Sequence, residues 1–242
     1  MKKISLQSWI LLFILLLNSN NMNAQKINYN ALHPHQVSLA SISALTAVGD
    51  MEKLNPELNR GLDAGLTVNE IKESLVQLYA YCGFPKSLNA IASFREVLEE
   101  RKKKGIADVE GKDDNPLTDT SGRYETGRKV LEQLTKMPQA KPAPGFGVFA
   151  PRIDAFLKEH LFADIFASQV LSYHQREWVT ISALAAMKGT EGQLQSHIGM
   201  GINTGITEDQ LTELFSLIGE KISEEQAQVA RGAFAKTKSL KK

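Results

Sequence analysis

The most constraining feature of this sequence is a pattern of helix signals that occurs twice. Gly65 precedes the stretch TVNE, which begins at Thr67, and Gly205 precedes TEDQ, which begins at Thr207. Threonine followed three residues later by Glu or Gln is a capping-box signature, and glycine commonly ends a helix. Both signals recur about 140 residues apart. This agreement favours a duplicated helical unit.

Apolar positions follow the same spacing. ISAL occurs at Ile42 and again at Ile181, and the apolar face that starts at Ile71 has a counterpart at Leu211. Alternating β-branched residues are scarce, whereas helix-forming residues are common. We therefore predict an all-α protein, a tandem duplicated helical bundle whose two units pack about a pseudo-twofold axis.

Changes in composition predict the domain limits. A stretch rich in Gly, Asp, Asn, Pro, Thr and Ser separates the two units, as expected of a linker. The predicted divisions are a signal peptide at 1–24, a first repeat at 25–104, a linker at 105–122, and a second repeat with a helical preamble at 123–242.

The N-terminus has the pattern of a secretory signal. Lys2 and Lys3 precede the apolar run WILLFILLL, and Ala24 offers a cleavage point. The run is short for a membrane span. We expect a periplasmic or secreted protein with no stable membrane association after cleavage. The alternative is an uncleaved N-terminal anchor.

Charge and cysteine content exclude several function classes. The net charge is +1 and no basic stripe is present, so nucleic-acid binding is not expected. The single cysteine, Cys82, excludes a disulfide within the chain and a Cys-x-x-Cys redox pair. Its apolar surroundings favour a buried structural residue. His33 and His35 form an H-x-H pair without a third metal ligand nearby, which favours a solvated loop.

The two units differ in residues that can perform acid–base chemistry. The second carries Arg176 and Glu177 at the start of a predicted helix and His197 on the next one. The first unit has no Glu or His at the matching places. Subtracting the shared scaffold therefore leaves Arg176, Glu177 and His197 as the functional candidates.

Three stretches resemble the carboxymuconolactone decarboxylase family, which includes the alkylhydroperoxidase D-like proteins. They are REWVTISALAAM, LQSHIGMGINTGITEDQL and, in the first unit, ESLVQLYAYCGFPKSLNA. The resemblance implies an all-helical fold and a homo-oligomer, here a trimer of two-repeat chains.

The redox branch of that family has a Glu, a Cys-x-x-Cys pair and a His four residues after the second Cys. Glu177 and His197 match the Glu and the His, but the Cys positions fall on Thr190 and Gln193. No thiol therefore remains at this site to attack a peroxide or exchange with a disulfide.

The decarboxylase branch implies a lyase without metal or organic cofactor. Its substrates are carboxylated lactones, and His197 is the best candidate proton donor, with Glu177 as its orienting or partner base. Arg176, His174 and His160 are candidate substrate-binding residues. The three main candidates also have structural alternatives. His197 can be a histidine whose hydrogen bonds are satisfied at an interface, Glu177 can be a carboxylate that stabilises the start of its helix, and Arg176 can be solvated or paired with a nearby carboxylate.

Three functions remain open at this point. The first is a cofactor-free decarboxylase or lyase acting on a small carboxylated lactone or related organic acid. The second is an alkylhydroperoxidase or peroxiredoxin-type antioxidant protein, which the missing Cys pair disfavours. The third is a non-catalytic oligomeric binding module.

Overall fold

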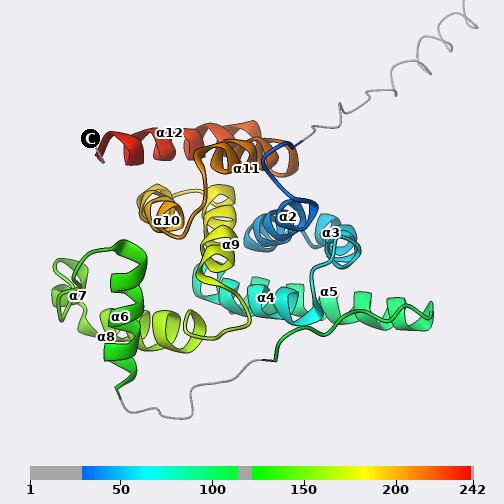
Figure 1. Ribbon diagram of the computed structural model, residues 1–242, viewed down its shortest axis with the longest axis horizontal. Helices are drawn as coiled ribbons and strands as arrows, with labels where there is room; N and C mark the ends of the chain where they lie inside the picture. The colour runs from blue at the N-terminus through cyan, green and yellow to red at the C-terminus, as the bar shows by residue number, and fades with distance from the viewer. Residues whose placement is uncertain (1–28, 114–121, 241–242) are drawn as a thin grey trace, which may run out of the picture. The chain divides into compact units, whose positions relative to one another are not determined.

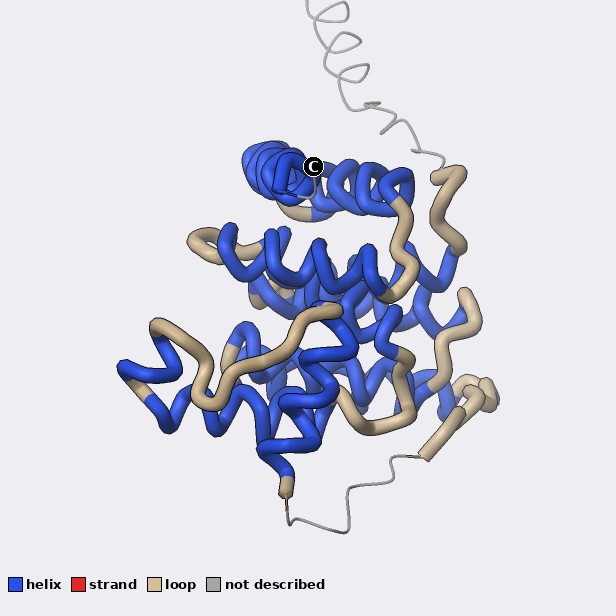
Figure 2. Tube along the Cα trace, turned by 60° about the vertical axis from the view of Figure 1, so that its left-hand side comes forward, coloured by secondary structure: helices blue, strands red, loops and turns tan. Residues whose placement is uncertain are grey.

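Twelve helical segments make up the described part of the computed structural model, which covers residues 29–113 and 122–240. No strand occurs in these residues (Figure 2), so the predicted all-α fold is confirmed. The predicted signal peptide lies outside the described residues. The helices are α2 (Pro34–Val48), α3 (Met51–Asp63), α4 (Val68–Cys82), α5 (Phe84–Lys103), α6 (Arg123–Thr135), α7 (Phe146–Phe149), α8 (Pro151–Ala155), η1 (Phe156–Ile165), α9 (Tyr173–Ala186), α10 (Glu191–Asn203), α11 (Glu208–Lys221) and α12 (Glu224–Leu240).

Helices α2 and α9 form the centre of the unit that spans residues 31–242. Both are buried along most of their length, and they pack against each other. Their small residues allow this close approach, and the indole nitrogen of Trp178 donates a hydrogen bond to the carbonyl of Gln36 at 2.9 Å. Helices α11 and α12 lie on one side of this pair, and α4 and α5 lie on the other (Figure 1).

The two sets of helices, α2–α5 and α9–α12, share the same local capping and glycine signals. Thr67 and Thr207 both form complete capping boxes, and Gly65 and Gly205 both have left-handed backbone conformations, with φ of 97° and 102°. The duplication itself remains a prediction, which these parallels support.

The start of the predicted linker is held against the first set of helices. The amides of Val68 and Asn69 donate hydrogen bonds to the carbonyls of Val109 and Glu110, both at 2.9 Å. The first turn of α4 thereby gains partners for two amides that a helix start would otherwise leave unpaired.

Apolar residues at helical spacing predict a single helix over residues 151–166 in the preamble, with Ile153, Phe156, Leu157, Leu161 and Ile165 on one face. The structure differs from this prediction. The preamble consists of α8 followed by the π-helix η1. A π-helix has i→i+5 hydrogen bonds, so its side chains do not follow the 3.6-residue period on which the prediction rested. Ile153 and Phe156 were expected on the buried face but are 51% and 55% exposed, whereas Leu161 and Ile165 are buried.

A second apolar cluster joins the preamble to the rest of the unit. Helix α6 packs on η1 and on α10, and η1 also contacts α4. The members of the cluster are Val130, Leu134, Leu161, Phe162, Ile165, Phe166 and Met200.

None of the described helices is both long and apolar enough to cross a membrane.

Gly127 sets the distance between α6 and η1. A Cβ atom at this position would lie 1.7 Å from the carbonyl oxygen of Lys158, which is backbone and cannot move aside. We expect Gly127→Ala to lower the free energy of unfolding by about 1–3 kcal/mol, as overpacking does. Urea denaturation measures the change. Gly232→Ala is the matched control, because Gly232 lies in α12 with open space around it. Its stability should be equal or slightly raised, and equal effects of the two changes would contradict this explanation.

Candidate active site

The structure brings Glu177 and His197 together. Glu177 lies in the first turns of α9, and His197 lies in the middle of α10. The Nδ1 atom of His197 is 2.8 Å from Oε2 of Glu177. Glu177 is fully buried and His197 is 7% exposed. A buried carboxylate held against one ring nitrogen fixes the orientation of the imidazole.

Close packing of α10 on α9 makes this contact possible. Gly201 faces α9, and a Cβ atom there would lie 2.7 Å from the side chain of Ile181. Gly199 and Gly201 follow His197 in the sequence, and because glycine has no side chain, they predict a close approach by another chain or a ligand. Gly201 instead admits the neighbouring helix of the same chain, whereas Gly199 has open space and lines a pocket.

His197 also lines a pocket of about 540 Å³. Because Glu177 occupies Nδ1, Nε2 is the ring nitrogen left for a ligand. The pocket lies between α10 and the preamble, and its size suits a small molecule. Its lining residues are Leu131, Thr135, Gln139, Ala143, Phe146, Asp154, Leu157, Lys158, Phe162, Gly192, Gln193, Ser196, His197, Gly199, Met200 and Asn203.

Tyr81 is a neighbour of this pair that the sequence analysis did not single out. It comes from α4, and its ring stands edge-on to that of His197 with centroids 5.6 Å apart. Burial and the nearby Glu177 carboxylate raise the pKa of Tyr81 above its ordinary value. Tyr81 lies in LYAYCGFP, so the first half of the chain supplies part of the wall around His197.

Asp154, Lys158 and Tyr124 form a buried polar cluster on the preamble side of the pocket. The Nζ atom of Lys158 donates to Asp154 Oδ1 at 2.7 Å, to the Tyr124 hydroxyl at 2.9 Å and to the Ala140 carbonyl at 3.1 Å. The Tyr124 hydroxyl also donates to Asp154. These contacts hold the pKa of Asp154 below its usual value, although burial opposes them. Sequence periodicity provides no signal for this cluster, because its members come from separate segments.

Arg176 occupies a different environment from the one predicted. Its side chain is fully buried, and its Nη2 atom lies 2.6 Å from Glu73 Oε1 and 3.1 Å from the carbonyl oxygen of Ser168. Nη1 donates to Gln77 at 3.0 Å. These contacts favour the structural alternative, in which Arg176 pairs with a nearby carboxylate, and its binding of a substrate carboxylate stays an untested prediction. The residue joins α9 to α4, and it does not line the pocket at His197.

His160 and His174 lie outside the His197 pocket. His160 is exposed, its Nδ1 atom lies 2.9 Å from Asp164 Oδ2, and it lines a different pocket of about 660 Å³ with Tyr79 and Phe84. His174 is half-buried at the start of α9, and burial lowers its pKa. Their predicted substrate-binding roles remain predictions, and the structure does not bring these residues together with His197.

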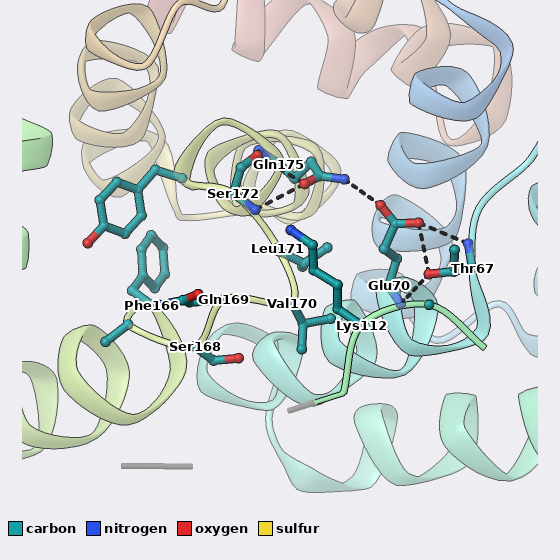
Figure 3. A pocket seen from close by; sticks show the side chains of 13 residues that line it. Thr67, Glu70, Lys112, Phe166, Ser168, Gln169, Val170, Leu171, Ser172 and Gln175 are labelled. Atoms are coloured by element: carbon teal, nitrogen blue, oxygen red, sulfur yellow. Dashed lines mark hydrogen bonds between the residues drawn. The ribbon is translucent and has the colours of Figure 1, made fainter. Parts of the chain in front are cut away.

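A third pocket, of about 530 Å³, lies at the N-terminal ends of α4 and α9 (Figure 3). Its wall contains hydrogen bonds from Gln175 to Glu70 and from the backbone amide of Thr67 to Glu70. Lys112 and Ser168 also line it. His197 and Glu177 do not, so this pocket has no histidine–carboxylate pair.

Cys82 is half-buried at the end of α4, and its thiol donates to the Leu78 carbonyl at 3.2 Å. Burial raises its pKa, so less thiolate is present at any given pH. We expect native protein at pH 8 to react with Ellman's reagent at least about tenfold more slowly than urea-unfolded protein. Absorbance at 412 nm follows the reaction. Equal rates for the two forms would contradict a shielded structural thiol.

A comparison with protein families agrees with these observations. The model of the carboxymuconolactone decarboxylase family matches residues 18–96. No curated protein matches the chain. The family has the all-α alkylhydroperoxidase D-like fold, and the helices described above agree with it. Glu177 and His197 lie outside the matched residues. The match shows that the N-terminal part of the chain, residues 18–96, is similar to the carboxymuconolactone decarboxylase family.

Proposed function

We propose that the chain is a cofactor-free lyase that decarboxylates a small carboxylated lactone or a related organic acid. The observation that carries this proposal is the 2.8 Å contact between Glu177 and His197 at the wall of a pocket. An oriented imidazole next to a cavity is a suitable general acid and base near neutral pH. The similarity of residues 18–96 to the carboxymuconolactone decarboxylase family supports decarboxylase-like chemistry at the level of the family alone.

The proposed reaction breaks the bond between the carboxylate and the adjacent carbon of the substrate. Carbon dioxide leaves, and the electron pair of that bond moves into the conjugated lactone as a dienolate. The protonated Nε2 of His197 then delivers a proton to carbon, and the imidazole regains its proton from solvent. Glu177 stabilises the imidazolium and holds the ring in place.

The antioxidant alternative lacks its reactive groups. The residues at the two cysteine positions are Thr190, at the N-terminal cap of α10, and Gln193, on the pocket wall. The remaining thiol, Cys82, is half-buried with a raised pKa. The binding-module alternative differs from the proposal only in predicting ligand binding without turnover.

Carbon dioxide release from a panel of carboxylated γ-lactones and β,γ-unsaturated lactones tests the proposal. We expect release above the buffer rate for at least one lactone and no peroxide consumption that depends on Cys82. If no lactone loses carbon dioxide, the lyase proposal fails. Peroxide turnover that disappears in Cys82→Ser would favour the antioxidant function.

We further propose that the protein is exported and assembles as a homotrimer. The export proposal rests on the signal-like N-terminal sequence, and the assembly proposal rests on the family resemblance. Large exposed apolar side chains support an interface between copies, among them Phe149, Val148 and Phe84. Size-exclusion chromatography with light scattering measures the assembly state, and a monomer at micromolar concentration would contradict it.

A further inference from the structure

The charges around the His197 pocket limit the ligand that it can hold. Of its described lining residues, Asp154, Lys158 and His197 carry ionisable side chains. Asp154 and Lys158 belong to the buried cluster with Tyr124, and His197 is paired with Glu177. Whether either pair offers a cationic donor to a ligand decides which anions the pocket accepts.

Lys158 has no donor left for a ligand. Its ammonium has three N–H groups, and they are directed at Asp154, Tyr124 and Ala140. The Asp154 carboxylate in turn accepts from Lys158, Tyr124 and the Ala143 amide. The cluster is therefore neutral as a whole and has no side-chain donor left, so a substrate carboxylate gains neither an ion pair nor a hydrogen bond from it.

His197 offers one donor to an anion. When the imidazole is protonated, its charge is balanced by Glu177 at Nδ1, and Nε2–H is left as one charge-assisted donor for a ligand in the pocket that His197 lines. When the imidazole is neutral, the pair keeps the negative charge of Glu177. One carboxylate can therefore be satisfied at this end of the pocket, and only with the imidazolium.

The rest of the wall carries no charge. Most of its surface is apolar, and its remaining side chains are the uncharged polar ones of Thr135, Gln139, Gln193, Ser196 and Asn203. A second carboxylate would lose its hydration there and meet no cation, which is strongly unfavourable for a charged group. The apolar part of the wall would instead favour the body of a hydrophobic ligand. The residues that provide it are Leu131, Phe146, Leu157, Phe162 and Met200.

We infer that the His197 pocket selects ligands with an apolar body and a single carboxylate, and that it rejects dicarboxylates. This inference rests on the proposed function in one respect, namely that the ligand binds next to His197. It deepens that proposal by fixing the charge of the substrate class. It does not depend on turnover, because the selection acts on binding.

Binding of three related saturated lactones to the full chain tests the inference by isothermal titration calorimetry. The probes are 5-oxotetrahydrofuran-2-carboxylate, its neutral methyl ester, and 5-oxotetrahydrofuran-2,3-dicarboxylate. None of them has the conjugation needed to decarboxylate. We expect the monocarboxylate to bind at least about tenfold more tightly than the dicarboxylate. In His197→Gln, affinity for the monocarboxylate should fall about tenfold or more, whereas affinity for the ester should change less than about threefold.

A gain-of-function variant provides a second test. Ser196 is exposed on the pocket wall, so Ser196→Lys adds a cation there without disturbing the core. We expect it to raise affinity for the dicarboxylate about tenfold. Ser239→Lys, on an exposed face of α12, is the matched control and should not change it. His35→Gln, at the exposed start of α2, is the control for His197→Gln.

Three results would overturn the inference. They are equal or tighter binding of the dicarboxylate, a monocarboxylate affinity that does not depend on His197, and no binding of the monocarboxylate at millimolar concentration. Failure of the lyase proposal looks different. In that case no conjugated lactone releases carbon dioxide, while the order of affinities among the three saturated lactones still holds.

Discussion

Replacing His197 with glutamine is expected to lower the turnover number for carbon dioxide release by about 10²–10⁴-fold, the range typical of a lost general acid. Glutamine has a similar size and a polar end, but it cannot deliver a proton near neutral pH. The loss should appear in kcat rather than in KM alone, because the proton is transferred in the chemical step. Initial rates of carbon dioxide release over a range of lactone concentrations measure both constants.

Glu177→Gln provides the companion measurement. The amide keeps the shape of the carboxylate, but it removes the negative charge that stabilises the imidazolium of His197. We expect kcat to fall at least about tenfold. Circular dichroism and thermal unfolding check that each variant is folded, and His35→Gln is the matched control for histidine loss. An unchanged kcat in His197→Gln would eliminate the catalytic role of this residue.

Arg176→Met is expected to lower the free energy of unfolding by about 3–5 kcal/mol, which is typical when one partner of a buried ion pair is removed. The substitution leaves the carboxylate of Glu73 buried without its guanidinium partner. It also removes the hydrogen bond from Arg176 to Gln77, and this bond joins the same region of α4 to α9. Urea denaturation followed by circular dichroism measures the change.

Two further variants separate the ion pair from other effects of the substitution. The double variant Arg176→Met/Glu73→Leu removes both charges, so it should recover much of the lost stability. Arg95→Met is the matched control, because Arg95 and Glu99 form an exposed pair, with 3.8 Å between Nε and Oε1. It should change stability by less than about 1 kcal/mol. A loss in Arg176→Met no larger than that of Arg95→Met would contradict the structural role of Arg176.

Helix limits were predictable where local chemistry determines them. Thr67 and Thr207 were expected to cap α4 and α11, and both do so through the amide three residues later. The same rule would have found the capping box at Ser172, whose partner is Gln175. These signals act over four residues, so the sequence contains all the information that they need.

The preamble was predictable only in part. Its apolar residues indicated a helix, and a helical segment is present over 151–165. The sequence has no local signal for π winding, which changes the face on which each side chain lies. The exposure of Ile153 and Phe156 therefore could not be deduced from a 3.6-residue period.

The candidate site was also predictable only in part. Glu177 and His197 were identified from the difference between the two halves and from the family resemblance, and they lie in direct contact. Tyr81 and Lys158 were missed because packing between distant segments places them: Tyr81 reaches the His197 ring from α4, and Lys158 reaches the pocket from η1. Arg176 was assigned to a ligand because a sequence does not reveal that Glu73 is its neighbour.

The arrangement of His197, with Nδ1 held by Glu177 and Nε2 directed to the pocket, can be measured directly. The measurement is a long-range ¹H–¹⁵N correlation spectrum of the histidine rings, with His197 assigned by its absence in His197→Gln. Saturating 5-oxotetrahydrofuran-2-carboxylate should shift the Nε2 resonance of His197, and Glu177→Gln should shift its Nδ1 resonance. The other four histidines of the chain are internal controls. An Nε2 resonance that the bound ligand leaves unchanged, or an Nδ1 resonance that is insensitive to Glu177→Gln, would contradict the proposed site.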